Sequence, residues 1–278
     1  MNLDHLPSLR EALNENGLAA KKSFGQHFLL DLNLTRKIVR QAEPLDGACV
    51  LEVGPGPGGL TRALVESPAA HVIAIEKDAR FVPLLNELSE AALGRMTLVE
   101  ADALSIDEAQ LTAPFGGATN THIISNLPYN VGTPLLIKWL TGSFTPKAMT
   151  LMFQKEVAMR TAAKAGSAAY GRLSVISQAL AEVKVVMQVP ARAFTPPPKV
   201  ESAVVHFRLL ADRPPPDRIA ALETVTAHAF GQRRKMLRSS LRPLGGEALC
   251  RDAEIDPDAR AETIPVEGFL RLAKRIAA

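Results

Sequence analysis

Residues 126–129 read Asn-Leu-Pro-Tyr and directly follow an apolar run that predicts a buried strand. The Asn126 side chain offers a carbonyl oxygen, and the peptide carbonyl of Leu127, before the rigid Pro128, offers a second acceptor. Two such acceptors can hold the –NH₂ group of a planar ring and draw its lone pair out of conjugation, while Tyr129 offers a stacking face. Asn and Pro are also common in ordinary turns, so the quartet alone is equally consistent with a loop.

A glycine-rich stretch, LEVGPGPGGLT (51–61), follows the first predicted strand. Glycine lets the backbone turn sharply and approach a ligand closely, and the helix that follows has free N–H groups at its N-terminus. Gly54, Gly56 and Gly59 match the pattern G-x-G-x-x-G of dinucleotide-binding folds, although that pattern alone is weak. The stretch therefore predicts a nucleotide-like cofactor without deciding which one.

Two acidic residues end the next strands and bear on the choice of cofactor. Glu76 stands where either kind of cofactor would place an acid on a pair of ribose hydroxyls. Asp102 distinguishes between the two cofactors. An S-adenosylmethionine site needs an acceptor for the adenine amino group at this position, whereas a nicotinamide enzyme does not. No second nucleotide-binding half follows. We expect S-adenosylmethionine rather than NAD; the remaining alternative is that these acids cap helices.

The chemistry that fits the quartet is methyl transfer from this cofactor to an amine. The sulfonium already makes the methyl group electrophilic, so positioning can supply much of the catalysis. No strong general base is required, and the sequence shows no His or Lys base beside the quartet. The six His residues lack metal-ligand spacing and Cys49 and Cys250 lie far apart, so we expect no metal and a plain buried thiol at Cys49.

The composition is that of a soluble globular protein, with 47% hydrophobic and 22% charged residues among 278. No apolar stretch is long enough to cross a membrane. The first twenty residues include Asp4, Glu11 and Glu15 and resemble neither a secretory signal nor an acid-poor transit peptide. We therefore expect a cytoplasmic protein.

Short apolar strands alternate with helical patterns, which predicts an α/β fold with a parallel sheet buried on both faces. The predicted strands are 48–53, 71–76, 96–100, 122–125 and 148–153, and the predicted helices between them are 61–66, 79–89 and 133–140. Two later strand-like segments, 182–189 and 202–209, are expected to pair as a hairpin at the sheet edge.

The stretch RPPPD (213–217) predicts a domain boundary, because such a run has no place in a helix or a central strand. We expect a catalytic domain over 1–212 and a small helical domain over 213–278. The helical domain should contain helices at 219–230, 235–241 and 266–276.

Positive charge is concentrated in the last third of the chain, where residues 190–278 hold 15 basic and 11 acidic residues. A basic cluster without acids lies within it, at Arg233, Arg234, Lys235, Arg238 and Arg242. Such a cluster suggests a polyanion partner, although a single basic stretch is more often a solvated face.

In their order, these motifs resemble the ribosomal RNA adenine N6,N6-dimethyltransferase family, most closely its bacterial small-subunit branch. The stretches that carry the resemblance are KKSFGQHFLLD (21–31), LEVGPGPGGLT (51–61), ISNLPYN (124–130), FQKEVAMR (153–160), FTPPPKVESAVV (194–205) and FGQRRKMLRSSL (230–241). The resemblance covers residues 21 to about 276. His27 stands where some relatives carry Asn, and Ser239 replaces an expected Asn.

The resemblance implies a Rossmann-like class I S-adenosylmethionine-dependent methyltransferase sheet with a small C-terminal helical domain. It implies that the cofactor is bound by His27, Leu29, Gly54, Glu76, Asp102 and Asn126. Glu76 would bind the ribose hydroxyls, and Asp102 would accept a hydrogen bond from the adenine amino group. It also implies a catalytic loop of Asn126, Leu127, Pro128 and Tyr129, a target base sandwiched by Tyr129 and Phe194, and RNA contacts from Arg233, Arg234, Lys235 and Arg238.

The implied reaction is dimethylation of N6 of two adjacent adenines in a hairpin loop near the 3′ end of 16S rRNA. The implied partner is the small ribosomal subunit or its precursor, and we expect a monomer. Three alternatives stay open: a large-subunit rRNA methyltransferase of the antibiotic-resistance type, a non-catalytic nucleic-acid-binding factor on the same fold, and a small-molecule methyltransferase. The basic cluster argues against the last, and the intact glycine loop and quartet argue against the second.

Overall fold

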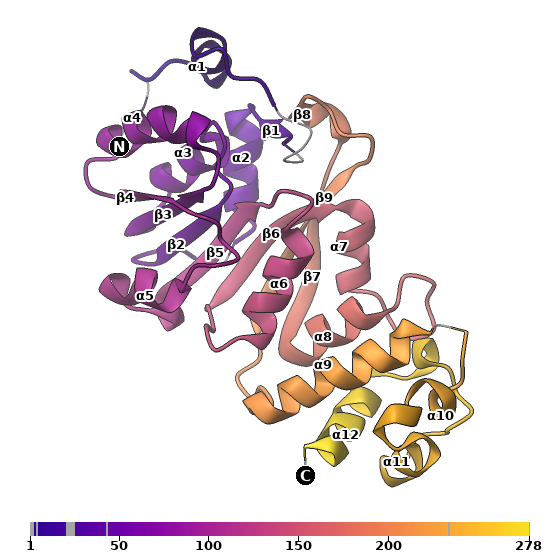
Figure 1. The fold of residues 1–278 in the computed structure, drawn as a ribbon. Helices are drawn as coiled ribbons and strands as arrows, with labels where there is room; N and C mark the ends of the chain where they lie inside the picture. The colour runs from indigo at the N-terminus through magenta and orange to yellow at the C-terminus, as the bar shows by residue number, and fades with distance from the viewer. Residues whose placement is uncertain (1–2, 4, 21–25, 43, 233, 278) are drawn as a thin grey trace. The chain divides into compact units, whose positions relative to one another are not determined.

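The computed structural model describes the chain except residues 1–2, 4, 21–25, 43, 233 and 278. A seven-stranded sheet with the order β4-β3-β2-β5-β6-β9-β7 forms its centre, and a two-stranded sheet pairs β1 with β8 (Figure 1). The strands are β1 Phe28–Leu29, β2 Cys49–Val53, β3 His71–Glu76, β4 Met96–Glu100, β5 Thr121–Asn126, β6 Ala148–Gln154, β7 Ala181–Val189, β8 Phe194–Thr195 and β9 Ser202–Leu209.

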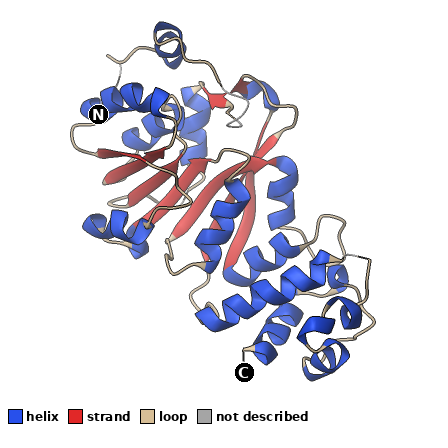
Figure 2. Ribbon diagram, in the orientation of Figure 1, coloured by secondary structure: helices blue, strands red, loops and turns tan. Residues whose placement is uncertain are grey.

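The predicted parallel sheet is confirmed, since β4, β3, β2, β5 and β6 pair in parallel with their neighbours. Every residue of β2 and of β3 is buried, as expected for strands covered by helices on both faces (Figure 2). The edge hairpin is confirmed as well, because β7 ends the sheet beside β9.

Helices follow most strands. They are α1 Leu9–Glu15, α2 Leu32–Val39, α3 Gly59–Glu66, α4 Val82–Ala91, α5 Glu108–Thr112, α6 Gly132–Thr141, α7 Lys155–Thr161, α8 Arg172–Leu180, α9 Pro216–Gly231, α10 Leu237–Ser240, α11 Gly246–Asp252 and α12 Val266–Ile276. The predicted helices at 61–66, 79–89 and 133–140 correspond to α3, to a 3₁₀ turn with α4, and to α6. None of the helices in the described part of the chain is long and apolar enough to cross a membrane.

The order of the strands creates a switch point between β2 and β5. The chain leaves β2 to add β3 and β4 on one side, and β5 then returns to pair with the other side of β2. The Ser125 hydroxyl donates to the Val53 carbonyl at 2.6 Å, which joins the ends of these two strands. Open parallel sheets bind ligands at the carboxyl ends of the strands beside such a point.

One prediction about the proline-rich stretch is wrong. Residues Pro216 and Asp217 lie inside the first turn of α9, and Pro215 caps it. Proline is tolerated at the first helical position because the N–H that it lacks would have no partner within the helix. The stretch thus begins a helix instead of only separating two elements.

The chain forms two compact units, one of residues 1–138, 144–158 and 185–207 and another of residues 139–143, 159–184 and 208–278. In the second unit α12 packs on α9, and the Phe230 ring lies 5.4 Å from that of Phe269 and 6.1 Å from that of Tyr170. The functional boundary predicted at 212/213 stays a prediction.

Candidate cofactor-binding and catalytic site

A cavity of about 310 Å³ opens at the carboxyl ends of the strands in the first unit. Its wall is built from the N-terminal motif, the glycine loop, the segments after β3 and β4, and the quartet at the end of β5. The predicted site residues that line it are His27, Leu29, Gly54, Glu76, Asp102, Asn126, Leu127, Pro128 and Tyr129. Five segments that are distant in sequence therefore meet at the switch point.

The glycine loop packs directly against the quartet. Gly54 has a φ of +68°, and its N–H donates to the Ile75 carbonyl at 2.9 Å. A Cβ atom at this position would lie 3.0 Å from Cγ of Pro128, closer than ordinary contacts allow. Both the backbone conformation and the close approach thus require glycine.

Glu76 is held by the backbone on both of its carboxylate oxygens. Oε2 accepts from the Gly56 N–H at 2.9 Å, and Oε1 accepts from the Asp78 N–H at 2.8 Å. Burial raises the pKa of Glu76, and these hydrogen bonds oppose that rise. A carboxylate has about four acceptor positions, so a carboxylate fixed in this way can still accept hydrogen bonds from a ligand.

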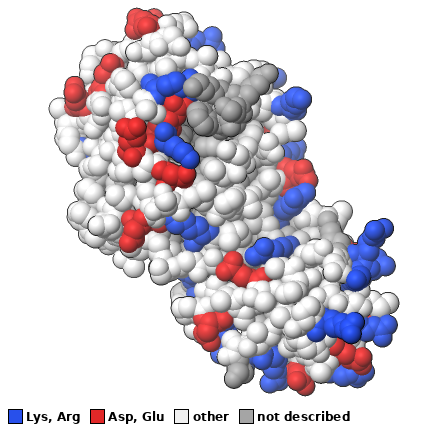
Figure 3. Space-filling view, in the orientation of Figure 1, with Lys and Arg blue, Asp and Glu red and all other residues white. Residues whose placement is uncertain are grey.

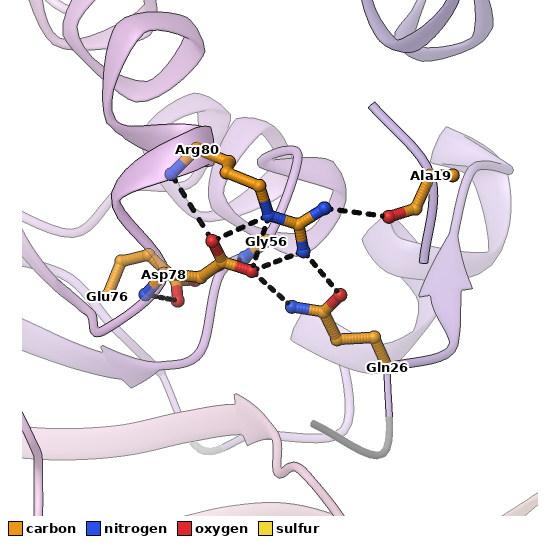
Figure 4. Close-up of polar contacts among 6 residues, drawn as sticks. All are labelled: Ala19, Gln26, Gly56, Glu76, Asp78 and Arg80. Atoms are coloured by element: carbon orange, nitrogen blue, oxygen red, sulfur yellow. Dashed lines mark hydrogen bonds and ion pairs between the residues drawn. The ribbon is translucent and has the colours of Figure 1, made fainter. Parts of the chain in front are cut away.

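A polar network ties the N-terminal motif to the segment after β3 (Figure 4). Asp78 accepts from Gln26 at 2.9 Å and from Nε of Arg80 at 2.9 Å. Arg80 also donates to the Gln26 side chain at 3.2 Å and to the Ala19 carbonyl at 3.1 Å. The hydrogen bond from Arg80 lowers the pKa of Asp78 to about 2, so Asp78 stays charged in this network. No local sequence pattern predicts this network.

Asp102 lies at the rim of the cavity, with 38% of its side chain exposed. Oδ1 accepts from the Leu104 N–H at 3.0 Å, and Oδ2 pairs with Nζ of Lys77 at 2.7 Å. The hydrogen bond from Lys77 is the main cause that lowers the pKa of Asp102. The side chain is therefore an ionised acceptor at neutral pH.

The N-terminal motif is positioned by the pairing of β1 with β8, in which Leu29 lies opposite Phe194. The His27 carbonyl accepts from Nδ2 of Asn126 at 3.3 Å. The His27 ring donates from Nδ1 to the Pro196 carbonyl at 2.8 Å, because a carbonyl can only accept.

An imidazole lies close to the quartet in the fold, although no His stands beside the quartet in the sequence. The His27 ring centroid lies 5.4 Å from that of Tyr129 and 6.5 Å from that of Phe194. The sequence does not indicate this contact, because the contact depends on the pairing of β1 with β8, two short strands far apart in the chain.

Tyr129 and Phe194 differ in accessibility. The Tyr129 hydroxyl forms a hydrogen bond with the Ser202 hydroxyl at 2.9 Å, and burial raises the pKa of the phenol, which stays protonated. Phe194 is only 3% exposed and belongs to the hydrophobic core, and it does not line the cavity. Tyr129 thus presents a fixed ring to the cavity, while the stacking role of Phe194 stays a prediction.

Glu52 is a cavity residue that the sequence reasoning missed. It is 1% exposed in the middle of the sheet, and its Oε2 atom has no hydrogen-bond partner. Burial raises its pKa to about 8; the Thr61 hydroxyl opposes the rise and the charge of Glu76 adds to it. The signal was present in the sequence as a charged residue inside the otherwise apolar strand CVLEV.

Glu52 should make stability depend on pH. Its pKa in the folded chain, about 8, lies above the ordinary value of 4.5, so the folded state binds a proton that the unfolded state has lost. Stability should then fall as pH rises from about 5 to about 8, by up to about 1.4 kcal/mol per pH unit. The free energy of unfolding of Glu52→Gln, relative to that of the wild type, should rise as the pH increases from about 5 to about 8. Above about pH 8 this difference should stay constant. Urea denaturation of the ligand-free chain at several pH values measures this.

The matched control is Glu87→Gln, which changes an exposed carboxyl on α4. If the difference between Glu52→Gln and the wild type does not vary with pH, Glu52 is ionised in the folded chain.

The basic cluster belongs to the second unit, and Figure 3 shows Lys and Arg side chains gathered on the visible face of this unit. Arg234, Lys235, Arg238 and Arg242 are exposed, whereas Arg233 lies outside the described residues. Arg238 forms an ion pair with Asp258 at 3.0 Å. Among the described residues no group of three or more His, Cys, Asp or Glu side chains is arranged to hold a metal ion.

Comparison with solved structures supports the fold. A dimethyladenosine transferase from Plasmodium falciparum superposes with a TM-score of 0.71 at 23% identity, over 88% of this chain and 96% of that one. The 23S rRNA methyltransferase ErmE superposes with a TM-score of 0.67 at 26% identity, over 90% of this chain and all of that one. The Rossmann-like methyltransferase fold that the sequence predicted is confirmed.

Comparison with curated sequences is more specific. The relative named Ribosomal RNA small subunit methyltransferase A from Phenylobacterium zucineum is 65% identical over 98% of this chain and 94% of its own length. The relative of the same name from Caulobacter vibrioides is 64% identical over 92% of this chain and 96% of its own length. The family model described as ribosomal RNA adenine dimethylase matches residues 17–278. With this match over nearly its whole length, the chain belongs to the ribosomal RNA adenine dimethylase family.

Proposed function

We propose that this chain transfers methyl groups from S-adenosylmethionine to N6 of two adjacent adenines in a hairpin loop near the 3′ end of 16S rRNA. The observation that carries the proposal is the convergence of the glycine loop, the acids after β3 and β4, and the quartet on one cavity. Relatives with more than 60% identity that carry the small-subunit name support the choice of RNA. The substrate would be the small ribosomal subunit or its precursor in the cytoplasm, and the enzyme would act as a monomer.

The residues around the cavity fit S-adenosylmethionine. Glu52 lines the cavity and its Oε2 atom has no hydrogen-bond partner among the described residues, so it would accept from the ammonium group of the cofactor. This bound cation would favour loss of the proton that Glu52 holds in the unbound chain. The glycine loop lines the cavity from Gly54 to Pro57, and its backbone would lie along the amino-acid portion of the cofactor. Glu76 would accept from the ribose hydroxyls and Asp102 from the adenine amino group, and His27, Leu29 and Asn126 would complete the wall. The cofactor supplies an electrophilic methyl group when bound.

The quartet would orient the adenine amino group. Nδ2 of Asn126 donates to the His27 carbonyl, so the amide is turned with its oxygen, Oδ1, available to accept. The Pro128 carbonyl accepts from the N–H groups of Val131 and Gly132 at 3.1 Å, which closes a tight turn before α6. The ring of Pro128 restricts the backbone on the other side, next to the Leu127 carbonyl that would be the second acceptor. Two acceptors in a rigid turn hold the amine lone pair toward the methyl donor, and this positioning replaces a general base.

The target base would stack on Tyr129. Its ring is held in place by the bond to Ser202, so stacking requires little loss of side-chain freedom. We propose Phe194 as the second face of the sandwich, which requires the His27 ring and the β8 segment to move when RNA binds, because Phe194 is buried in the unbound chain. An adenine within an RNA loop must also swing out to enter the cavity.

The basic cluster would bind RNA phosphates, and we expect the replacement of Arg234, Lys235 and Arg238 by Gln to weaken binding. Each lost phosphate contact should lower the slope of log K against log salt by roughly 0.7 to 0.9. Arg238 should contribute less than the other two, because Asp258 already neutralises it. Filter-binding titrations at several salt concentrations measure both effects.

Lys37→Gln on α2 is the control, since it removes an exposed positive charge from the first unit. An unchanged slope in the triple variant would show that these side chains form a solvated face instead of a phosphate-binding surface.

The test of the proposed function is to incubate the protein with labelled S-adenosylmethionine and unmodified small subunits, and then to map the modified nucleosides. We expect N6,N6-dimethyladenosine at two adjacent positions in 16S rRNA. Large subunits serve as the parallel substrate because of the similarity to ErmE. Label only in 23S rRNA would establish the large-subunit alternative, and no label in either would support a non-catalytic role.

A further inference from the structure

Helix α6 follows the quartet in the chain (Figure 1). Its residue Lys138 forms hydrogen bonds with the segment after β4. Nζ donates to the Ala103 carbonyl at 3.0 Å, to the Ile106 carbonyl at 2.7 Å and to Oε1 of Glu108 at 2.8 Å. An ammonium group has three N–H donors, and all three are used here. The side chain of Lys138 is 28% exposed and that of Glu108 only 4%.

The segment bound by Lys138 is the part of the cavity wall that carries Asp102. Residues 101–104 line the cavity, and Asp102 itself is bonded to the Leu104 N–H. Lys138 binds the main chain immediately after Asp102 and again at Ile106, so it holds both sides of this turn. The Lys138 charge also contributes to the lowered pKa of Asp102.

We propose that Lys138 is a positioning residue that sets Asp102 against the adenine amino group of the cofactor by bracing the 101–107 loop from α6. The proposal rests on the assignment of Asp102 in the proposed function. It goes beyond that assignment because α6 also follows Asn126, so one lysine couples the adenine end of the cavity to the methyl-transfer end.

Other main-chain hydrogen bonds of this loop lie within it or at its first residue. The Asp102 carbonyl accepts from the N–H and the hydroxyl of Ser105, both at 2.9 Å. The Ala101 N–H donates to the Glu76 carbonyl at 3.0 Å. Lys138 instead ties the Ala103 and Ile106 carbonyls to a helix outside the loop. Without Lys138 two main-chain carbonyls lose a charged donor, and such hydrogen bonds are stronger than neutral ones. The loop should then sample positions in which Asp102 no longer faces the amino group.

The experiment compares the affinity for two ligands by calorimetry: S-adenosylhomocysteine, and S-inosylhomocysteine, which has an oxygen in place of the adenine amino group. The wild type should bind S-adenosylhomocysteine about 10- to 100-fold more tightly than S-inosylhomocysteine. The second ligand lacks the amino group that would donate to Asp102, and its oxygen would be repelled by that carboxylate. In Lys138→Met this ratio should shrink to within about threefold. Lys155→Met, which removes a partly exposed lysine paired with Glu201 at 2.7 Å, should keep the wild-type ratio.

Loss of Lys138 leaves the buried Glu108 carboxylate without this partner, which can destabilise the chain on its own. The double variant Lys138→Met with Glu108→Gln removes that charge. The ratio of the two ligand affinities should be as small in this variant as in Lys138→Met.

The outcomes separate the two claims. If the wild type itself does not distinguish the two ligands, the assignment of Asp102 in the proposed function fails. If the wild type distinguishes them and both Lys138 variants do so equally well, Asp102 stands and the positioning role of Lys138 is overturned. A uniform loss of affinity for both ligands with an unchanged ratio also overturns it, because a merely structural lysine would act in that way.

Discussion

Asn126→Ala should reduce methyl transfer by at least about 100-fold, since misplacing a reacting group by about 1 Å has an effect of this size. The substitution removes the acceptor oxygen and also the hydrogen bond to the His27 carbonyl at 3.3 Å. The amine would then lose one of its two acceptors, and the N-terminal motif would lose its link to β5. The measurement is the rate of label transfer to small subunits in a single turnover.

RNA binding should survive this substitution, because phosphate contacts dominate affinity for RNA. The control is Asn86→Ala, which removes an exposed Asn from α4 in the same unit. A transfer rate within a few-fold of the wild type in Asn126→Ala would remove the catalytic role assigned to the quartet.

Gly59→Ala should disrupt the cofactor site without touching a cofactor-binding side chain. A Cβ atom on Gly59, at the start of α3, would lie 2.1 Å from the Leu29 carbonyl oxygen, which is far inside contact distance. Since this neighbour is backbone, β1 must move away, and His27 and Leu29 move with it. Forcing an extra methyl group into a packed site typically destabilises by about 1 to 3 kcal/mol. We expect a lower melting temperature and at least about tenfold weaker binding of S-adenosylhomocysteine.

Gly231→Ala at the end of α9 is the matched control, because an added Cβ atom there meets no atom within 4 Å. Thermal unfolding and calorimetry on both variants make the comparison. Normal cofactor affinity in Gly59→Ala would show that β1 does not need its present position to form the site.

Much of the site could be predicted because its signals are local. Glu76 and Asp102 stand at strand ends, Gly54 stands in a glycine loop, and Asn126 stands in the quartet, so each was found from its own stretch of sequence. All four line one cavity, as parallel strands with a common carboxyl edge require. Glu52 could have been found in the same way, as a charge within a buried strand.

Other parts of the site had no local signal. Lys138 binds the 101–107 loop from more than thirty residues further along the chain. The network of Asp78, Arg80 and Gln26 joins segments more than fifty residues apart. Helical spacing would assign Lys138 to a solvated face, since lysine is rarely buried. The position of Phe194 in the core likewise follows from pairing with Leu29 and not from the proline-rich stretch around it.

The strands, the parallel sheet, the edge at which a cofactor would bind and the residues at the strand ends there can all be predicted from the amino-acid sequence. These follow from hydrophobic periodicity and turn residues, which act over a few neighbouring positions. Three features become visible only in the folded chain: the His27 ring lies near Tyr129, Phe194 is buried, and Lys138 binds the loop that carries Asp102. Such contacts join residues up to 169 positions apart, as in the hydrogen bond between His27 and Pro196, and they depend on side-chain packing that no local pattern encodes.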